Sequence, residues 1–161
     1  MASWILDAAP LKAHGSGGRA REFLGDCWDH FAVIFYYPND ILLSFTSKQV
    51  GKGWDDIGCR IYGTTGTIDT HYSGKVEVIC DDPLKGDTRG LYQIGAQNNI
   101  AEFYRKVTTA DYTNTTVAPS VRSNLTTILG RMAAYQKREV TWDEMLQKNE
   151  KWSFDTSGLR A

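Results

Sequence analysis

The segment WDHFAVIFYY, residues 28–37, constrains the fold more than any other part of the sequence. An extended chain here places apolar side chains on both of its faces: Phe31, Val33, Phe35 and Tyr37 on one, and Ala32, Ile34 and Tyr36 on the other. A strand with two apolar faces is typical of a central strand that is covered on both sides. The turn residues Pro38-Asn39-Asp40 follow, and residues 41–49 return as a second strand. The sequence therefore predicts a central β-hairpin.

Further short strands are expected on either side of this hairpin. Residues 10–14 form a short candidate, residues 57–63 and 66–72 form a second hairpin around Thr64-Thr65-Gly66, and residues 75–80 form another strand. Five or six short strands that are joined by tight turns predict a mainly antiparallel sheet.

The second half of the chain has helical periodicity. Residues 97–108 carry apolar side chains at helical spacing, and a long helix is expected from Pro119 to about Lys137. Gly130 interrupts that helix and indicates close packing against the sheet. Thr141 and Glu144 form a capping box that opens a short last helix. Residues 1–161 are thus expected to form a single α+β domain, an open-faced antiparallel sheet with helices packed on one face.

The glycine-rich stretch HGSGGRAR, residues 14–21, fits the dinucleotide-binding pattern G-x-G-x-x-[G/A]. Its context does not fit, because no buried strand precedes it, no crossover helix follows it, and antiparallel strands come next. We therefore expect no nucleotide at this segment. The residues alone favour a flexible connection between strands. The alternative is a loop that places Arg19 or Arg21 at the edge of a pocket for an anionic or hydroxyl-rich ligand.

Asp29 and His30 form an adjacent acid–base pair near the start of the central hairpin. Neighbouring side chains on a strand point to opposite faces, so we expect no direct contact between these two, although either could line a cleft. His14, His30 and Cys27 match no familiar metal-site spacing and lack a fourth ligand. The sequence also has no G-x-S-x-G, H-E-x-x-H or Walker motif, so residue patterns alone do not indicate an enzyme.

The segment VGKGWDD, residues 50–56, places Lys52 and Trp54 between glycines in a loop between two strands. An aromatic ring beside a lysine suits a sugar-like ligand or a partner surface. An exposed loop with Trp54 folded back on the sheet explains the same residues equally well.

Charge and composition exclude some classes of function. The net charge is -1 and the basic residues are scattered, which is unlike a nucleic-acid-binding protein. No apolar run is long enough to cross a membrane. The three cysteines are far apart, which favours reduced thiols and a cytoplasmic location, unless an upstream signal exports the parent protein.

Several segments together resemble one family. YGTTGTI, residues 62–68, resembles a hairpin in the C-terminal domain of the glucose–fructose oxidoreductase and inositol dehydrogenase (Gfo/Idh/MocA) family. LGRMAAYQKREVTWDEML, residues 129–146, resembles the last long helix of that domain and the capped helix after it. KAHGSGGRAR and GDCWDHFAVIFYYPND resemble the start of the domain, and the resemblance covers nearly all of residues 4–154.

The resemblance implies a domain that lines a substrate site and forms a dimer or tetramer through the free face of its sheet. It places the segments GSGGR and SKQVGKGW where the substrate domain meets the cofactor domain. Four side chains become expected contacts for a sugar or polyol substrate: Arg19, Lys48, Lys52 and Trp54. Asp29 and His30 occupy the family's acidic motif at a strand start and join this substrate-binding set.

The resemblance also implies what lies outside these residues. Family members carry a Rossmann domain that binds NAD or NADP, followed by catalytic Lys, Asp and His residues, before the tryptophan that Trp4 resembles. We therefore expect a substrate-binding and oligomerisation domain that has no cofactor of its own and is inactive alone. The alternative is a stand-alone sugar-binding or dimerisation module without catalysis.

Overall fold

The computed structural model describes residues 1–22, 26–53, 55–72, 74–151, 153, 155 and 157–158. The chain divides into two compact units. The larger unit comprises Ser3–Gly51 and Ala118–Ala161, and the smaller comprises Met1–Ala2 and Lys52–Val117. The expected α+β class is confirmed, with the strands divided between two open antiparallel sheets rather than one. The assignment of residues 1–161 to one domain stays a prediction.

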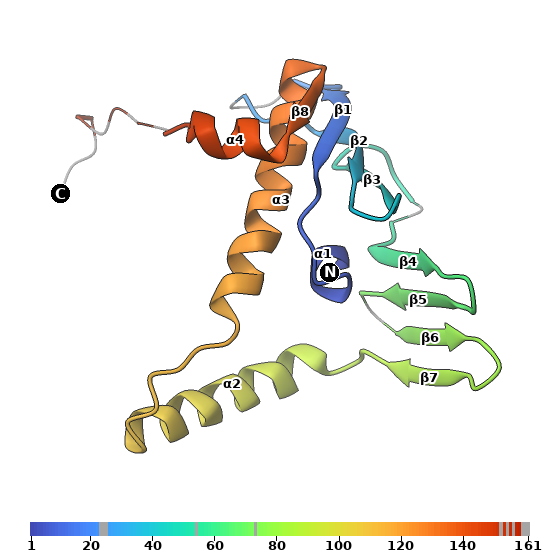
Figure 1. Ribbon diagram of the computed structural model, residues 1–161, viewed down its shortest axis with the longest axis vertical. Helices are drawn as coiled ribbons and strands as arrows, with labels where there is room; N and C mark the ends of the chain where they lie inside the picture. The colour runs from blue at the N-terminus through green and yellow to red at the C-terminus, as the bar shows by residue number, and fades with distance from the viewer. Residues whose placement is uncertain are drawn as a thin grey trace. The chain divides into compact units, whose positions relative to one another are not determined.

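The larger unit contains a four-stranded antiparallel sheet. Its strands are β1 (Lys12–Gly18), β2 (His30–Tyr36), β3 (Leu42–Lys48) and β8 (Glu139–Thr141), in the order β3-β2-β1-β8 (Figure 1). The predicted hairpin of β2 and β3 is confirmed. Asn39 and Asp40 both have left-handed backbone angles in its turn, which the Tyr37 amide closes by donating to the Ile41 carbonyl at 2.8 Å.

One face of this sheet is covered by α3 (Val117–Gln136) and α4 (Trp142–Lys148). The sheet, α3 and α4 share one core of buried apolar residues: Ala13, Val33, Phe35, Tyr37, Leu129, Met132, Ala133, Ala134, Val140 and Met145. The predicted cap of α4 is confirmed, because the Glu144 amide donates to Thr141 Oγ1 at 3.1 Å. The Glu144 carboxylate binds Arg138 instead of reaching back to the cap.

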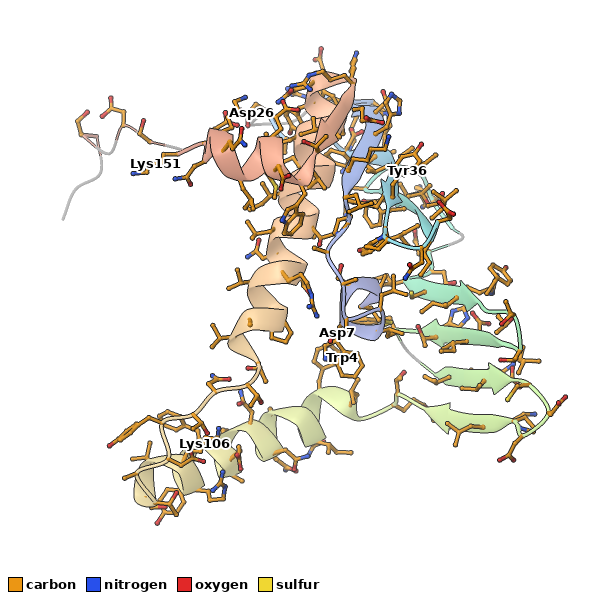
Figure 2. All side chains as sticks on the ribbon, viewed as in Figure 1. Trp4, Asp7, Asp26, Tyr36, Lys106 and Lys151 are labelled. Atoms are coloured by element: carbon orange, nitrogen blue, oxygen red, sulfur yellow. The ribbon has the colours of Figure 1, made fainter. Side chains whose placement is uncertain are left out.

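The N-terminal residues of the larger unit are joined to its core by polar contacts. The short helix α1 (Ala2–Ile5) places Ser3 Oγ 2.7 Å from the Tyr37 hydroxyl, and Ser3 also donates to Thr126 Oγ1 at 3.2 Å. Asp7, labelled in Figure 2, pairs with Arg122 of α3. Burial raises the pKa of the Tyr37 hydroxyl above its usual value, so Tyr37 stays uncharged at neutral pH.

The opposite face of β2 is open, so the expectation that both faces are covered is wrong for the described residues. Ile34 is 41% exposed, and Ala32 is also exposed. The cross-strand neighbours of Ile34 are His14 on β1 and Ser44 on β3. One apolar strand face is therefore bordered by polar side chains, a context that the strand's own sequence does not reveal.

The prediction of a flexible connection at the glycine-rich stretch is wrong, because this stretch forms most of strand β1. A Cβ atom on Gly15 would lie 2.8 Å from Val33 Cγ2, and one on Gly17 would lie 2.3 Å from the His30 carbonyl oxygen. Both distances are too short for a real side chain. These glycines therefore allow β1 to lie close against β2.

The smaller unit contains a second four-stranded sheet. Its strands β4 (Gly58–Tyr62), β5 (Thr67–His71), β6 (Lys75–Ile79) and β7 (Leu84–Asp87) pair in chain order (Figure 1). The predicted hairpin of β4 and β5 is confirmed, since the Gly63 amide donates to the Gly66 carbonyl at 2.8 Å. The four-residue β7 and the three-residue β8 were not predicted, because such short segments carry too little periodicity.

Helix α2 (Leu91–Thr108) follows this sheet and begins before the predicted residue 97. The apolar side chains that predicted the helix, Ile100, Phe103, Tyr104 and Val107, are all exposed.

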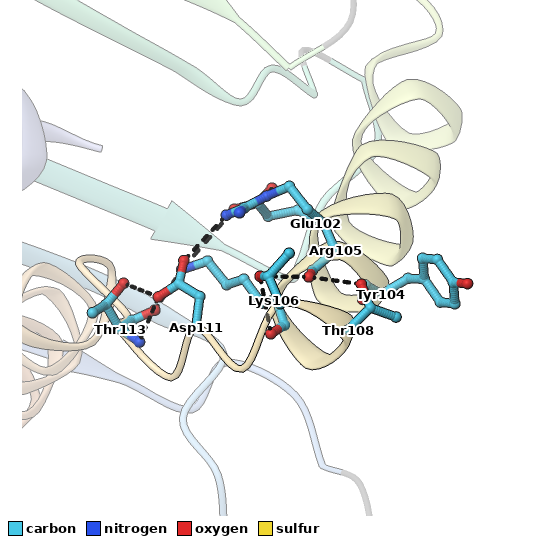
Figure 3. A network of polar contacts seen from close by, with 8 residues as sticks. Glu102, Tyr104, Arg105, Lys106, Thr108, Asp111 and Thr113 are labelled. Atoms are coloured by element: carbon cyan, nitrogen blue, oxygen red, sulfur yellow. Dashed lines mark hydrogen bonds and ion pairs between the residues drawn. The ribbon is translucent and has the colours of Figure 1, made fainter.

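Polar contacts join the C-terminal end of α2 to the residues that follow it (Figure 3). Arg105 binds both Glu102 and Asp111, and Lys106 donates to the Thr113 carbonyl. The hydroxyl and amide of Thr113 lower the pKa of Asp111 to about 2. No helix among the described residues has the length and apolar character to cross a membrane.

The predicted close packing at Gly130 is confirmed. A Cβ atom there would lie 2.5 Å from Cζ of Phe35, which is buried. Overpacking of a core typically costs about 1–3 kcal/mol, and the helix propensity of alanine returns about 1 kcal/mol. We expect Gly130→Ala to lower the free energy of unfolding by about 1 kcal/mol in urea denaturation. Gly95→Ala in α2 is the matched control.

A Cβ atom on Gly95 would meet no atom within 4 Å. Gly95→Ala is therefore expected to leave stability unchanged or to raise it by up to about 1 kcal/mol. Equal effects of the two substitutions would contradict the packing of α3 against Phe35.

Candidate functional site

The candidate site lies at one end of the larger sheet, where three strands come together. Gly18, His30 and Lys48 occupy the same row of the sheet, on β1, β2 and β3. Arg19 follows directly after β1, and Asp29 directly precedes β2. The structure thus brings together four of the six predicted substrate contacts: Arg19, Asp29, His30 and Lys48.

Asp29 organises this end of the sheet. Its carboxylate is buried and accepts hydrogen bonds from the Ala20 amide at 2.9 Å and the Arg21 amide at 3.1 Å. It also lies 2.8 Å from His30 Nδ1. Its main-chain amide donates to the Gly18 carbonyl at 2.9 Å. One carboxylate therefore fixes the turn after β1 and the ring at the start of β2.

The expectation that Asp29 and His30 do not touch is wrong. The alternation rule holds inside a regular strand, and β2 begins only at His30. Asp29 lies one residue before the strand, and its carboxylate turns toward the amides of Ala20 and Arg21. Residue types alone do not indicate these two main-chain donors, because the direction of a backbone amide is not encoded in residue type.

The electrostatics favour an ionised Asp29. Burial opposes the charge, but hydrogen bonds from His30 and from the amides of Ala20 and Arg21 outweigh it, and the pKa of Asp29 is lowered. An ionised carboxylate only accepts hydrogen bonds, so Nδ1 of His30 carries a proton. The His30 side chain is 45% exposed. A ring fixed in this way can accept a hydroxyl proton at Nε2 or, when protonated, pair with an anion.

Cationic side chains surround the Asp29–His30 pair and bond to main-chain carbonyls. Arg21 Nη2 donates to the Gln49 carbonyl at 2.9 Å, and Arg19 Nε donates to the Arg21 carbonyl at 3.3 Å. Lys48 Nζ lies 3.5 Å from the Val50 carbonyl. The sequence predicts Arg21 only as an alternative to Arg19. In the structure Arg21 lies at the same end of the sheet as Arg19. Donors of this kind suit a hydroxyl-rich or anionic ligand.

Comparison with known proteins gives a likeness in fold. A solved structure of a candidate oxidoreductase from Thermotoga maritima is similar to this chain, with a TM-score of 0.58 and 15% sequence identity. The likeness covers 86% of this chain and 42% of that chain. The chain therefore spans less than half of the length of this solved structure. No protein-family model and no curated protein matches the sequence. At this identity the likeness concerns the fold alone.

The other two predicted contacts, Lys52 and Trp54, are not tested by the structure. Lys52 is exposed and belongs to the smaller unit, so its role stays a prediction. Trp54 lies outside the described residues, so its role also stays a prediction.

The chain's residues do not fit a dinucleotide at the glycine-rich stretch. Gly15, Gly17 and Gly18 are paired in register with β2, and none of the described residues between them and β2 is helical. A phosphate-binding turn needs a strand that passes directly into a helix N-terminus. Among the described residues, no group of three or more His, Cys, Asp or Glu side chains is placed to hold a metal ion.

Proposed function

We propose that this chain is the substrate-binding and oligomerisation part of an NAD(P)-dependent oxidoreductase that acts on a sugar or polyol. The observation that carries the proposal is the buried Asp29 carboxylate that orients the half-exposed ring of His30 at a basic end of the sheet. The likeness of the fold to a candidate oxidoreductase supports the reaction class.

In this proposal the chain binds and orients the substrate. His30 Nε2 accepts a hydrogen bond from a substrate hydroxyl or, when protonated, donates one to a carboxylate. Arg19 and Lys48 supply further donors to the oxygens of the same ligand. Asp29 is a positioning residue, because it acts through the ring that it holds. The nicotinamide nucleotide belongs to a separate domain of the parent protein, since the glycine-rich strand does not fit it.

The oligomerisation half of the proposal is supported by the open face of the larger sheet. Ala32, Ile34 and Leu42 are exposed there, on two neighbouring strands. An apolar strip inside an otherwise polar face suits contact with a second copy of the chain better than contact with water.

The binding half is tested by calorimetric titration of the chain with glucose, myo-inositol and gluconate. We expect at least one of them to bind, and His30→Ala to raise its Kd by about tenfold, which corresponds to about 1.4 kcal/mol. His14→Ala is the matched control, because His14 is an exposed histidine on β1 of the same sheet and lies away from Asp29. Its Kd should equal that of the wild type.

Two outcomes would contradict the proposal. If none of the three compounds binds, the substrate-binding role is contradicted. If His30→Ala binds with the same Kd as the wild type, the site does not include His30. Light scattering on the same sample tests the oligomerisation half, which predicts a dimer or tetramer and is contradicted by a monomer.

A further inference from the structure

A second group of charged side chains surrounds His71 in the smaller unit. His71 Nδ1 lies 2.9 Å from Asp56 Oδ1, and Nε2 lies 3.4 Å from Asp69 Oδ2. The His71 side chain is 27% exposed. Both nitrogens of the ring therefore have a carboxylate partner, one on the segment before β4 and one on β5.

This geometry requires a particular protonation state. Carboxylates are acceptors only, and a neutral imidazole has one N–H and one lone pair. A lone pair on either nitrogen would face a carboxylate oxygen, which is unfavourable. The arrangement is stable when both nitrogens of His71 carry hydrogen, that is, when the ring is positively charged. Hydrogen bonds and charge from Asp56 and then Asp69 accordingly raise the pKa of His71.

Other charges face the same side of the small sheet. Arg60 on β4 donates to both oxygens of Asp69, at 3.1 and 3.2 Å. Asp69 is the cross-strand neighbour of Glu77 on β6, which pairs with Lys75 and, at 3.4 Å, with Lys85 of β7. Lys75 in turn faces Asp87 in the β6–β7 register. The neighbouring acids and bases pair with one another, whereas Asp56 has His71 as its partner.

The Asp56–His71 pair joins the segment before β4 to β5, just beyond the last paired residues of the two strands. Gly58 and His71 are partners in the β4–β5 register, and the Tyr72 amide donates to the Ile57 carbonyl at 2.8 Å. Asp56 is the next residue outward. A Cβ atom on Gly58 would lie 3.4 Å from Asp56 Oδ2 and 3.5 Å from His71 Nδ1, so the pair lies directly beside Gly58.

We propose that His71 is a pH-dependent tether: its protonated ring holds residues 55–57 against the small sheet through both Asp56 and Asp69, and loss of one ring proton weakens that hold. This inference goes beyond the proposed function and rests on different residues. One consequence alone depends on that function: Lys52, a predicted substrate contact, lies shortly before the tethered residues, so the tether would also restrict its movement.

The direction of the pH dependence follows from the raised pKa of His71. The stabilisation is fully present below about pH 6.5, the ordinary pKa of histidine, and is lost as the pH rises through the raised value in the folded protein. At the acid end, Asp69 keeps its charge to lower pH than usual, because Arg60 and then His71 lower its pKa. The hold of His71 on residues 55–57 is therefore strongest in mildly acidic solution and weakens as the solution becomes alkaline.

The test is an NMR titration of the whole chain from about pH 5 to about pH 9, which spans the histidine range. The His71 ring signal reports its protonation, and hydrogen exchange at residues 55–57 reports the tether. We expect His71 to titrate above about pH 6.5, the ordinary pKa of histidine, and the exchange protection of residues 55–57 to fall over the same pH interval. Asp56→Asn should lower the midpoint of His71 and remove the pH dependence of the exchange.

Asp56 has a 61% exposed side chain, so this substitution is not expected to unfold the unit. His71→Gln should give weak protection at every pH. An unchanged His71 midpoint in Asp56→Asn, or protection of residues 55–57 that does not vary with pH in the wild type, would overturn the tether. Both readouts are independent of any sugar or nucleotide, so their failure is distinct from failure of the proposed function.

Discussion

Replacing Leu129 by alanine is expected to lower the free energy of unfolding of the larger unit by about 2–5 kcal/mol. Leu129 lies in α3 and is completely buried in the core between the helix and the sheet. The substitution removes apolar contacts and leaves a cavity that the surrounding side chains fill only in part. Urea denaturation measures the effect, with fluorescence of Trp28 and Trp142, which pack against this core, as the signal.

Leu146→Ala is the control for this substitution. Leu146 lies in α4 of the same unit, but 47% of its surface is exposed, so its truncation should cost clearly less. Equal losses in the two variants would mean that α3 does not cover the sheet in the way described.

Replacing Gly17 by alanine is expected to lower the free energy of unfolding by about 3 kcal/mol, near the upper end for overpacking. The new Cβ atom would lie 2.3 Å from the His30 carbonyl oxygen and 3.1 Å from Cε3 of Trp28. The carbonyl belongs to a paired strand and cannot rotate away. The Trp28 ring is stacked on Tyr135 at a centroid distance of 4.3 Å. The substitution must therefore separate β1 from β2, and the same urea experiment measures its cost.

Gly86→Ala tests whether the loss at Gly17 is specific. Gly86 is also a strand glycine, on β7, and a Cβ atom there would meet only Val76 Cβ at 3.9 Å. This variant should be as stable as the wild type or slightly more stable, because alanine is less flexible in the unfolded chain. A wild-type stability for Gly17→Ala would restore the interpretation of residues 14–21 as a flexible loop.

The parts of the fold that the sequence predicts are those with strong local signals. The hairpin of β2 and β3 follows from the apolar run in residues 28–37 and the turn at Asn39 and Asp40. The cap of α4 follows from Thr141 and the residues after it. The close packing of Gly130 also follows, because a glycine in a strong helix needs a structural reason.

The errors come from features that depend on tertiary contacts. The freedom of glycine to adopt unusual backbone angles favours a flexible connection at Gly15 and Gly17, but close contact with β2 overrides that preference. The exposed face of β2 could not be foreseen, because its polar surroundings come from β1 and β3. The apolar stripe of α2 predicted a helix correctly, but the exposure of its side chains has no signal in the periodicity.

The candidate site was only partly predictable. Residue type and resemblance indicated Arg19, Asp29, His30 and Lys48, and the strand register brings them to one sheet end. The pattern does not reveal the contact between Asp29 and His30, because β2 starts at His30, two residues after the predicted start at Trp28, and Asp29 lies outside the strand. The amides of Ala20 and Arg21 that bind Asp29 have no signal in the sequence at all.

The most direct test of the central claim, that the sheet end around Asp29 and His30 is a ligand site, is an amide NMR titration with gluconate and with myo-inositol. We predict shifts concentrated at Ala20, Arg21, His30 and Lys48, and their loss in Asp29→Asn, which weakens the hold on the His30 ring. Shifts confined to other parts of the chain, or shifts that persist unchanged in Asp29→Asn, would contradict the claim.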